Sequence, residues 1–265
     1  MPELPDVEIF KRYVARTSLN KRVESVTVRN AKILGKVSTK ALGATVKGRR
    51  FRAVRRHGKY LFINLDNSKW LTMHFGMSGS LHYFKSVDEA PEFDRLIFTF
   101  SDGYHLGYYS VRLLGRVDLV DNATQFIMSK NLDEDALDPK LTSKTFEELL
   151  SSAKGTVKSF LMDQTVIGGI GNIYSDEILF QARLHPKRKV SGLDRNTMDR
   201  IYGKMRGVLM KAIECGADSD RLPRSYLIPH RQKGDHCPRC GGPITQIKIG
   251  GRSSYICTQC QGMHE

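Results

Sequence analysis

The spacing of apolar residues changes along the chain, from a helical period at the start to short β-rich runs. Val7, Phe10 and Val14 recur at helical spacing after Pro5, which predicts a short helix over residues 5–19. The β-rich runs that follow are separated by Gly, Asn and Asp turns. They cover residues 22–29, 51–55, 60–65, 70–75, 80–84, 95–100 and 116–120. A leading helix followed by several short strands predicts an antiparallel β-sandwich.

Helical spacing returns in the second half of the chain, after an acidic and polar stretch that we interpret as a linker. Apolar residues recur three and four positions apart in residues 144–153, 156–164, 172–183 and 194–213. Asp194 is the expected N-cap of the last of these helices. Two further β-rich runs, at residues 244–249 and 253–256, predict a terminal β-hairpin.

These patterns together predict an α+β fold with three domains. The expected parts are a β-sandwich domain at residues 1–128, a linker at 129–145, a helical domain at 146–235 and a metal-binding module at 236–265. We find no internal repeat and no low-complexity tract in the sequence.

The charge of the chain points to a polyanionic partner. The 265 residues include 42 Lys and Arg against 28 Asp and Glu, a formal net charge of +14. The basic residues are clustered: residues 40–59 hold eight of them and no acid, and residues 221–252 hold seven with Asp235 as the only acid. Two such faces favour nucleic acid as the partner.

The N-terminus has no basic start followed by an apolar stretch, so no secretory signal is expected. No apolar run approaches the ~20 residues that cross a bilayer. We therefore expect a protein of the cytoplasm, associated with the nucleoid in a prokaryote, without membrane contact. Disulfides are disfavoured in that compartment, so the five cysteines need another explanation.

Four of these cysteines have the spacing of a zinc site. Cys237 and Cys240 form one CxxC pair, and Cys257 and Cys260 form another after sixteen intervening residues. Four thiolates leave no open position for water, so one structural Zn²⁺ is expected. The alternative is two redox pairs, which the absence of a βαβ pattern disfavours, and Cys215 is interpreted as core packing. The turn Gly250-Gly251-Arg252 would place a cation at the hairpin tip, where it could contact phosphates.

The N-terminus also carries candidate chemistry. Removal of Met1 would expose Pro2 as a secondary amine, and an α-amino group has a pKa of ~8 against ~10.4 for Lys. Condensation of this amine with a sugar aldehyde gives an iminium ion, an electron sink for elimination. Glu3 stands beside Pro2 and could supply the proton transfers. A Pro-Glu terminus alone is weak support, because most chains beginning Met-Pro do nothing with it.

Several separated motifs resemble the formamidopyrimidine-DNA glycosylase and endonuclease VIII family of bifunctional DNA glycosylases. The matching strings are Pro2-Glu-Leu-Pro5, Lys59-Tyr-Leu, His74-Phe-Gly-Met-Ser-Gly-Ser-Leu81, Phe160-Leu-Met-Asp163, Gly169-Ile-Gly-Asn-Ile-Tyr174, His185-Pro186 and the final Gly-Arg-Ser-Ser-Tyr-Ile-Cys-Thr-Gln-Cys-Gln. They span nearly the whole chain in family order. The Pro-Glu-Leu-Pro opening is more similar to the formamidopyrimidine branch.

This resemblance implies an N-terminal β-sandwich, a helix-two-turns-helix domain and a zinc hairpin that clamp damaged double-stranded DNA. It implies that Pro2 attacks the sugar C1′ of an everted nucleotide, with Glu3 as the acid-base group and Lys59 near the reacting sugar. It also implies that a monomer excises oxidised or ring-opened purines and then cleaves the abasic strand by β,δ-elimination.

The resemblance assigns further residues to DNA binding. Asn172, Lys158 and Arg252 would form a phosphate clamp; the Gly-rich loop at Asn172 would offer exposed backbone amides, while Lys158 alone could equally be a solvated helix face. Met77 and Arg112 would enter the base stack and fill the space of the everted base. His74 is expected to be structural or phosphate-facing, not a general base.

Three departures from the family pattern affect specificity. The family commonly has Glu at the position of Asp6, and Phe at the third wedge position, which is Leu114 here. The segment from Gly216 to Cys237 is shorter than in the formamidopyrimidine branch, where it covers an everted 8-oxoguanine. We therefore expect 8-oxoguanine to be a poorer substrate than formamidopyrimidines, hydantoins or abasic sites.

Other interpretations stay open from the sequence. One is an endonuclease VIII-like glycosylase for oxidised pyrimidines. Another is a non-catalytic zinc-finger protein that binds damaged DNA, which charge and cysteines fit equally well; such a protein has no need of the Pro-Glu terminus or Lys59. An RNA-binding protein is disfavoured because no RNA-binding motif is found.

Overall fold

The computed structural model describes residues 1–132 and 134–262. The chain forms two compact units. The first, here called the sandwich unit, comprises Met1–Pro2 and Asp6–Lys130. The second, the helical unit, comprises Glu3–Pro5 and Asn131–Glu265. The first residues of helix α1 (Leu4–Thr17) thus group with the helical unit, while the rest of α1 packs in the sandwich unit.

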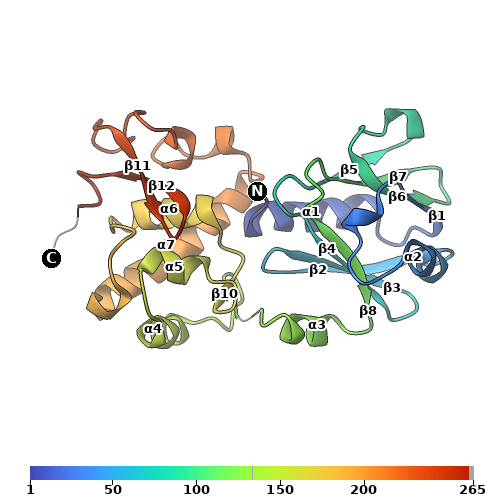
Figure 1. Cartoon of the computed structure of the whole chain (residues 1–265), viewed down its shortest axis with the longest axis horizontal. Helices are drawn as coiled ribbons and strands as arrows, with labels where there is room; N and C mark the ends of the chain where they lie inside the picture. Colours follow the sequence, from blue (N-terminus) through green and yellow to red (C-terminus); the bar gives the residue numbers. More distant parts are fainter. Residues whose placement is uncertain (133, 263–265) are drawn as a thin grey trace. The chain divides into compact units, whose positions relative to one another are not determined.

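The sandwich unit is built from two four-stranded antiparallel sheets (Figure 1). One sheet has the order β1-β6-β7-β5, with β1 Val23–Val28, β6 Asp94–Phe100, β7 His105–Tyr109 and β5 Ser80–Phe84. The other has the order β2-β3-β4-β8, with β2 Phe51–His57, β3 Tyr60–Leu65, β4 Trp70–His74 and β8 Arg116–Val120. Helices α2 (Thr39–Val46) and α3 (Ala123–Ser129) complete the unit. The predicted β-sandwich with a leading helix is confirmed.

Both sheets contribute to one apolar core. Phe98 and Leu106 from the first sheet belong to the same buried cluster as Leu61 and Leu71 from the second. Val7 of α1 joins this cluster, as the helical spacing of its apolar residues predicted. The sheets are also joined by a hydrogen bond, in which the buried Tyr108 hydroxyl donates to the backbone carbonyl of His74 at 2.8 Å.

The sequence pattern missed strand β7 and helices α2 and α3 of this unit. Strand β7 has Gly107 at its centre, and α2 contains Gly43 and β-branched residues, so neither follows a strong local preference. Tertiary packing decides α2, because it buries Leu42 and Val46, and the Ser38 hydroxyl caps it by accepting from Ala41 N–H.

The helical unit contains four helices of the predicted ranges, within a few residues at each end. They are α4 (Ser143–Ser152), α5 (Val157–Met162), α6 (Asn172–Gln181) and α7 (Arg195–Glu214). The Asp194 carboxylate accepts from Thr197 N–H at 2.7 Å, which confirms Asp194 as the N-cap of α7. Two turns separate α5 from α6, and a two-residue strand there, β10 (Ile167–Gly168), pairs in parallel with β9 (Glu134–Asp135).

The chain ends in the predicted hairpin, formed by β11 (Ile244–Ile249) and β12 (Arg252–Cys257). Its small apolar cluster consists of Phe180, Leu227, Cys237, Ile244 and Cys257. Arg252 does not stand in the turn as predicted, because it pairs with Ile249 and leaves only Gly250 and Gly251, both with positive φ, in the turn. No helix among residues 1–132 and 134–262 is long and apolar enough to cross a membrane.

Candidate functional site

The Glu3 carboxylate lies at the N-terminus of α6, where it is completely buried. It accepts hydrogen bonds from the backbone N–H groups of Gly171 at 2.7 Å, Ile173 at 2.9 Å and Tyr174 at 3.2 Å. Three N–H donors and the positive end of a helix stabilise the negative charge of a carboxylate. Glu3 therefore caps α6, whose N-cap residue Gly171 has no side chain to do so.

The glycines of the preceding loop make this approach possible. A Cβ at Gly171 would lie 2.5 Å from the Glu3 carboxyl carbon, and one at Gly169 would lie 2.8 Å from the Leu4 Cβ. Gly169 also has a φ of +111°, and its carbonyl accepts from Leu4 N–H at 2.9 Å. The glycines of the Gly-Ile-Gly-Asn string therefore leave the space in which Glu3 and Leu4 pack against this loop.

This arrangement corrects the expected anion site at Asn172. The amides of its Gly-rich loop are not exposed, because Glu3 occupies those of Gly171, Ile173 and Tyr174. The Asn172 side chain instead donates from Nδ2 to the carbonyl of Ser253 in β12 at 2.8 Å. Its Oδ1 is buried and has no hydrogen-bond partner among the described residues. The residue links α6 to the zinc hairpin.

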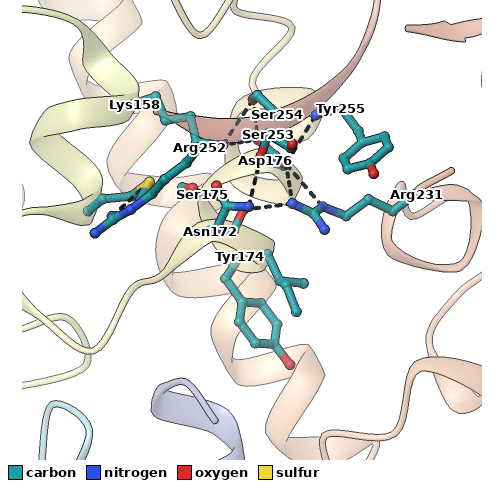
Figure 2. Close-up of polar contacts among 12 residues, drawn as sticks. Lys158, Asn172, Tyr174, Ser175, Asp176, Arg231, Arg252, Ser253, Ser254 and Tyr255 are labelled. Atoms are coloured by element: carbon teal, nitrogen blue, oxygen red, sulfur yellow. Dashed lines mark hydrogen bonds and ion pairs between the residues drawn. The ribbon is translucent and has the colours of Figure 1, made fainter. Parts of the chain in front are cut away.

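One turn further along α6, Asp176 is the centre of a buried polar cluster that we call the Asp176 cluster, with Lys158, Arg231 and Ser254 (Figure 2). Its Oδ1 lies 2.5 Å from Lys158 Nζ and accepts from the Ser254 hydroxyl at 2.5 Å. Its Oδ2 accepts from Arg231 Nη2 at 2.7 Å and Nε at 3.0 Å. The backbone N–H of Tyr255 also donates to Oδ2, at 3.2 Å. Both oxygens of the carboxylate are thus saturated with donors.

Lys158 is not a solvated residue on a helix face, and this alternative is wrong. Its side chain is 1% exposed, and its ammonium donates to Ser254 Oγ at 2.9 Å as well as to Asp176. Burial lowers the pKa of Lys158, and the neighbouring Asp176 carboxylate opposes that shift. A buried, paired ammonium does not suit the direct phosphate contact that we expected of Lys158.

Lys158 does line an open groove of about 440 Å³ between α5 and the hairpin. Exposed Arg252 stands on the same groove, together with backbone of Gly155 and Gly250. In Figure 2 the Arg252 side chain points away from Asp176, toward the sulfur atom of Met162. The groove thus combines one exposed cation with one buried cation.

Two adjacent loops of the sandwich unit carry exposed apolar side chains. Met77 is 44% exposed and Leu114 is 48% exposed. The loops touch closely, since a Cβ at Gly76 would lie 2.5 Å from the backbone of Leu114. Arg112 is exposed on the second loop, and Leu113 next to it adopts a φ of +53°. Large apolar side chains held outward beside a cation suit insertion into a base stack.

His74 and Lys59 also belong to the sandwich unit. Burial, with the Lys59 and Arg116 charges, lowers the pKa of His74 to about 4, so the imidazole is neutral at pH 7. Its Nδ1 accepts from Gly76 N–H at 3.3 Å, which leaves the ring proton on Nε2. Lys59 lies in the two-residue turn between β2 and β3. His74 can therefore donate a neutral hydrogen bond but offers no positive charge.

The four predicted zinc ligands converge at the end of the hairpin. Their Sγ atoms all lie within 4.8 Å of one another, with Cys237 and Cys260 at 3.8 Å and Cys240 and Cys257 at 3.4 Å. Tetrahedral Zn–S bonds of about 2.3 Å require sulfur atoms about 3.8 Å apart, so the cluster fits one zinc ion without an open position. Arg239 packs on the Phe180 ring at 4.5 Å and donates to the Phe180 carbonyl, which docks the first CxxC turn on α6.

Sequence reasoning missed Asp176, Glu177 and Arg231. Glu177 is fully buried, and its Oε2 accepts from Ile228 N–H at 2.8 Å. Burial raises the pKa of Glu177 to about 7. Asp176 and Glu177 are the only charged residues of α6, and these two adjacent acids were the signal that could have revealed these buried groups.

An N-terminal Pro-Glu, a β-sandwich, a helix-two-turns-helix domain and a Cys₄ hairpin together indicate the class of protein, a base-excision-repair DNA glycosylase with abasic-site lyase activity. Residues 1–117 match the family model of the formamidopyrimidine-DNA glycosylase N-terminal domain, residues 132–223 the H2TH domain, and residues 234–262 the zinc finger found in FPG and IleRS. The chain belongs to the formamidopyrimidine-DNA glycosylase family.

Relatives match along the full length. The formamidopyrimidine-DNA glycosylase of Exiguobacterium sibiricum is 34% identical, over 98% of this chain and 99% of that protein. The enzyme of Streptococcus pyogenes is also 34% identical, over 98% of each chain. The Lactococcus lactis enzyme bound to DNA with an abasic site has a TM-score of 0.89 and 26% identity, covering 98% of this chain and 99% of that one.

Proposed function

We propose that Pro2, freed by removal of Met1, is the nucleophile that attacks C1′ of the damaged nucleotide. The leaving base departs, and the secondary amine forms an iminium ion with the opened sugar. This fixed positive charge draws electrons from the C–H bond at C2′, so that β-elimination and then δ-elimination release the phosphates. The observation that carries the proposal is the anchoring of the adjacent residue, Glu3, by three backbone amides of α6.

We propose that Glu3 is the acid-base group of the reaction. Its position is set by backbone amides rather than by flexible side chains, which suits a group that must move a proton at a defined place. Lys59 supplies positive charge near the reacting sugar in this proposal. The Lys59 charge helps to lower the pKa of His74, so its positive charge is felt by neighbouring groups.

Met77, Arg112 and Leu114 form the proposed wedge in the base stack. The two apolar side chains are exposed on loops that touch. Large apolar side chains exposed together to water are typical of a surface that contacts a partner. Arg112 would donate hydrogen bonds to the base left unpaired. Leu fills space without the stacking that an aromatic ring provides, so discrimination of the opposite base should be weak.

Arg252 carries the proposed phosphate contact, with Lys158 contributing charge from beneath the groove and Asn172 in a supporting role. Arg252 is exposed on the groove that Lys158 lines. Asn172 keeps β12 against α6 through its bond to Ser253. The neutral Nε2–H of His74 could donate to a further phosphate oxygen.

The substrate range follows from the connector, residues 216–236. This segment is tied down along α6: Glu177 binds Ile228 N–H, Gln181 donates to the Ser225 carbonyl at 3.2 Å, and Arg231 binds Asp176. Because the connector is held against α6 at these points, little of its length can fold over an everted base. We therefore propose that formamidopyrimidines, hydantoins and abasic sites are preferred to 8-oxoguanine; equal single-turnover excision of 8-oxoguanine and a hydantoin would contradict this.

The same proposal includes a monomer acting on double-stranded DNA in the cytoplasm. All three family domains are present in one chain, so a second copy is not needed to complete the site. A mass of 30.0 kDa by light scattering, alone and with DNA subtracted, is the expected result. A stable dimer on one lesion would contradict it.

Borohydride trapping tests the nucleophile. A duplex with one abasic site is mixed with the protein, and the iminium is reduced to a stable amine. We expect a covalent adduct with wild type and a large loss with Pro2→Gly, whose primary amine has different reactivity. Absence of trapping in protein that lacks Met1 and binds the duplex would favour the non-catalytic DNA-binding alternative.

A further inference from the structure

The zinc ion can fix only one end of the hairpin. Cys257 is the last residue of β12, whereas Arg252 is the first. Arg252 and Cys257 are five residue steps apart along the strand, a span of about 17 Å. At the other end the turn consists of two glycines, which impose little stiffness. Something other than the metal must therefore hold Arg252 in place.

Consecutive residues of β12 are bound by two side chains of α6. Asn172 binds the carbonyl of Ser253, and Asp176 binds the hydroxyl of Ser254 and the N–H of Tyr255. Asn172 and Asp176 are one helical turn apart and so lie on the same side of α6. Figure 2 shows these bonds side by side, next to the point where Arg252 leaves the strand.

We infer that Asp176 is a positioning residue that sets the register of β12 on α6 and thereby holds Arg252 at the phosphate-binding groove. This inference rests on the proposed phosphate role of Arg252. Asp176 also ties in the connector through Arg231 and α5 through Lys158, so the walls of the groove and its cation share one anchor.

The charge balance explains why an acid is needed at this position. Lys158 is buried, and Arg231, 17% exposed, lies against the same carboxylate. Without Asp176 the two cations would repel each other with no counterion between them. An amide could keep some hydrogen bonds, but it would leave the positive charges unpaired and present an N–H₂ group to donors.

The test compares Asp176→Asn with Asp220→Asn, a matched loss of one negative charge at an exposed connector residue. Binding to a duplex carrying a reduced, uncleavable abasic-site analogue is measured over a series of salt concentrations. Both variants gain net positive charge, so a general electrostatic effect would tighten both. We expect Asp176→Asn instead to bind about 10-fold more weakly, with a salt slope smaller by about 0.9, the value of one phosphate contact.

Two controls separate positioning from loss of structure. Bound zinc should stay at one per chain, and the single-turnover rate on abasic DNA at saturating enzyme should stay within about threefold of wild type. If Asp176→Asn does not fold, Ser254→Ala decides the matter, since it removes the two hydrogen bonds of the Ser254 hydroxyl, to Asp176 and from Lys158, and leaves the ion pairs. It should weaken binding about threefold with full zinc content.

Arg252→Ala shows which step fails. Suppose that Arg252→Ala weakens binding but Asp176→Asn keeps the wild-type affinity and salt slope. Asp176 then does not position the cation, and the inference is overturned. Ser254→Ala is used in the same way if Asp176→Asn does not fold. If Arg252→Ala itself binds like wild type, the proposed phosphate contact is wrong, and the inference that depends on it falls as well.

Discussion

The two units are stabilised in different ways. The sandwich unit has a single large apolar cluster to which both sheets contribute, and among the described residues its fully or nearly buried charged side chains are Glu8, Arg56 and Asp94. In the helical unit that set is Glu3, Asp135, Lys158, Asp176 and Glu177. Buried charges are poor sources of stability but good sources of fixed geometry. We infer from the comparison that buried charges in the helical unit fix the positions of particular groups at a cost in stability.

The largest expected effect concerns Glu3, whose buried carboxylate is held by three backbone amides. Glu3→Gln keeps the shape of the side chain but removes the proposed proton-transfer group and replaces one acceptor of backbone N–H bonds with a donor. We expect base excision to fall about 10³-fold, in the range of general acid-base catalysis. Loss of the cap should also lower the free energy of unfolding by about 1 kcal/mol. Single-turnover excision and chemical unfolding measure the two effects; unchanged excision would remove Glu3 from the mechanism.

Loss of a zinc ligand should affect the helical unit and leave the sandwich unit intact. The hairpin cluster has only five buried residues, so metal binding provides most of its folding energy, about 10 kcal/mol or more in isolated zinc fingers. Cys257→Ser should bind no zinc and bind DNA about 100-fold more weakly. Cys215→Ser, outside the cluster, is the matched control. Near-wild-type DNA affinity in zinc-free Cys257→Ser would contradict the proposed role of the hairpin.

The buried Glu177 should make stability depend on pH. Its folded-state pKa of about 7 lies above the usual 4.5, so the folded protein binds a proton more readily than the unfolded chain. This contribution is fully present below pH 4.5 and is lost as pH rises toward 7 and beyond. Between pH 5 and 8 the free energy of unfolding should therefore fall by on the order of 2 kcal/mol because of Glu177, and Glu177→Gln should remove this pH dependence. Urea unfolding across that range measures it; identical pH profiles would contradict the burial argument.

The smallest expected effect lies in the sandwich unit, at the proposed wedge. Leu114→Phe restores the aromatic ring that the family usually has at this position. An aromatic ring stacks on a neighbouring base, worth ~1 kcal/mol, so discrimination between opposite bases should rise about 3- to 10-fold. The comparison is made by single-turnover excision of one lesion opposite each of the four bases. No change would indicate that Leu114 does not enter the stack.

The sequence predicted the sandwich strands with strong β-rich patterns, the four helices of the helical unit and the zinc ligands, because each has a local signal. It missed β7 and α2, whose glycines and β-branched residues give no such signal. Glu3 and the loop at residues 169–172 were both predicted to matter, yet their contact could not be anticipated, because about 168 positions separate them. Lys158 was placed incorrectly for a similar reason: its partners are Asp176 and Ser254, far along the chain.

The central claim is that the N-terminal amine of Pro2 carries the chemistry. Borohydride reduces the iminium ion and so fixes the protein to the DNA. Proteolysis and mass spectrometry of the DNA-linked peptide then identify the attached residue directly. We predict that the sugar is found on the N-terminal peptide, at the nitrogen of Pro2. A sugar attached to the side chain of Lys59 or Lys158 would contradict the account.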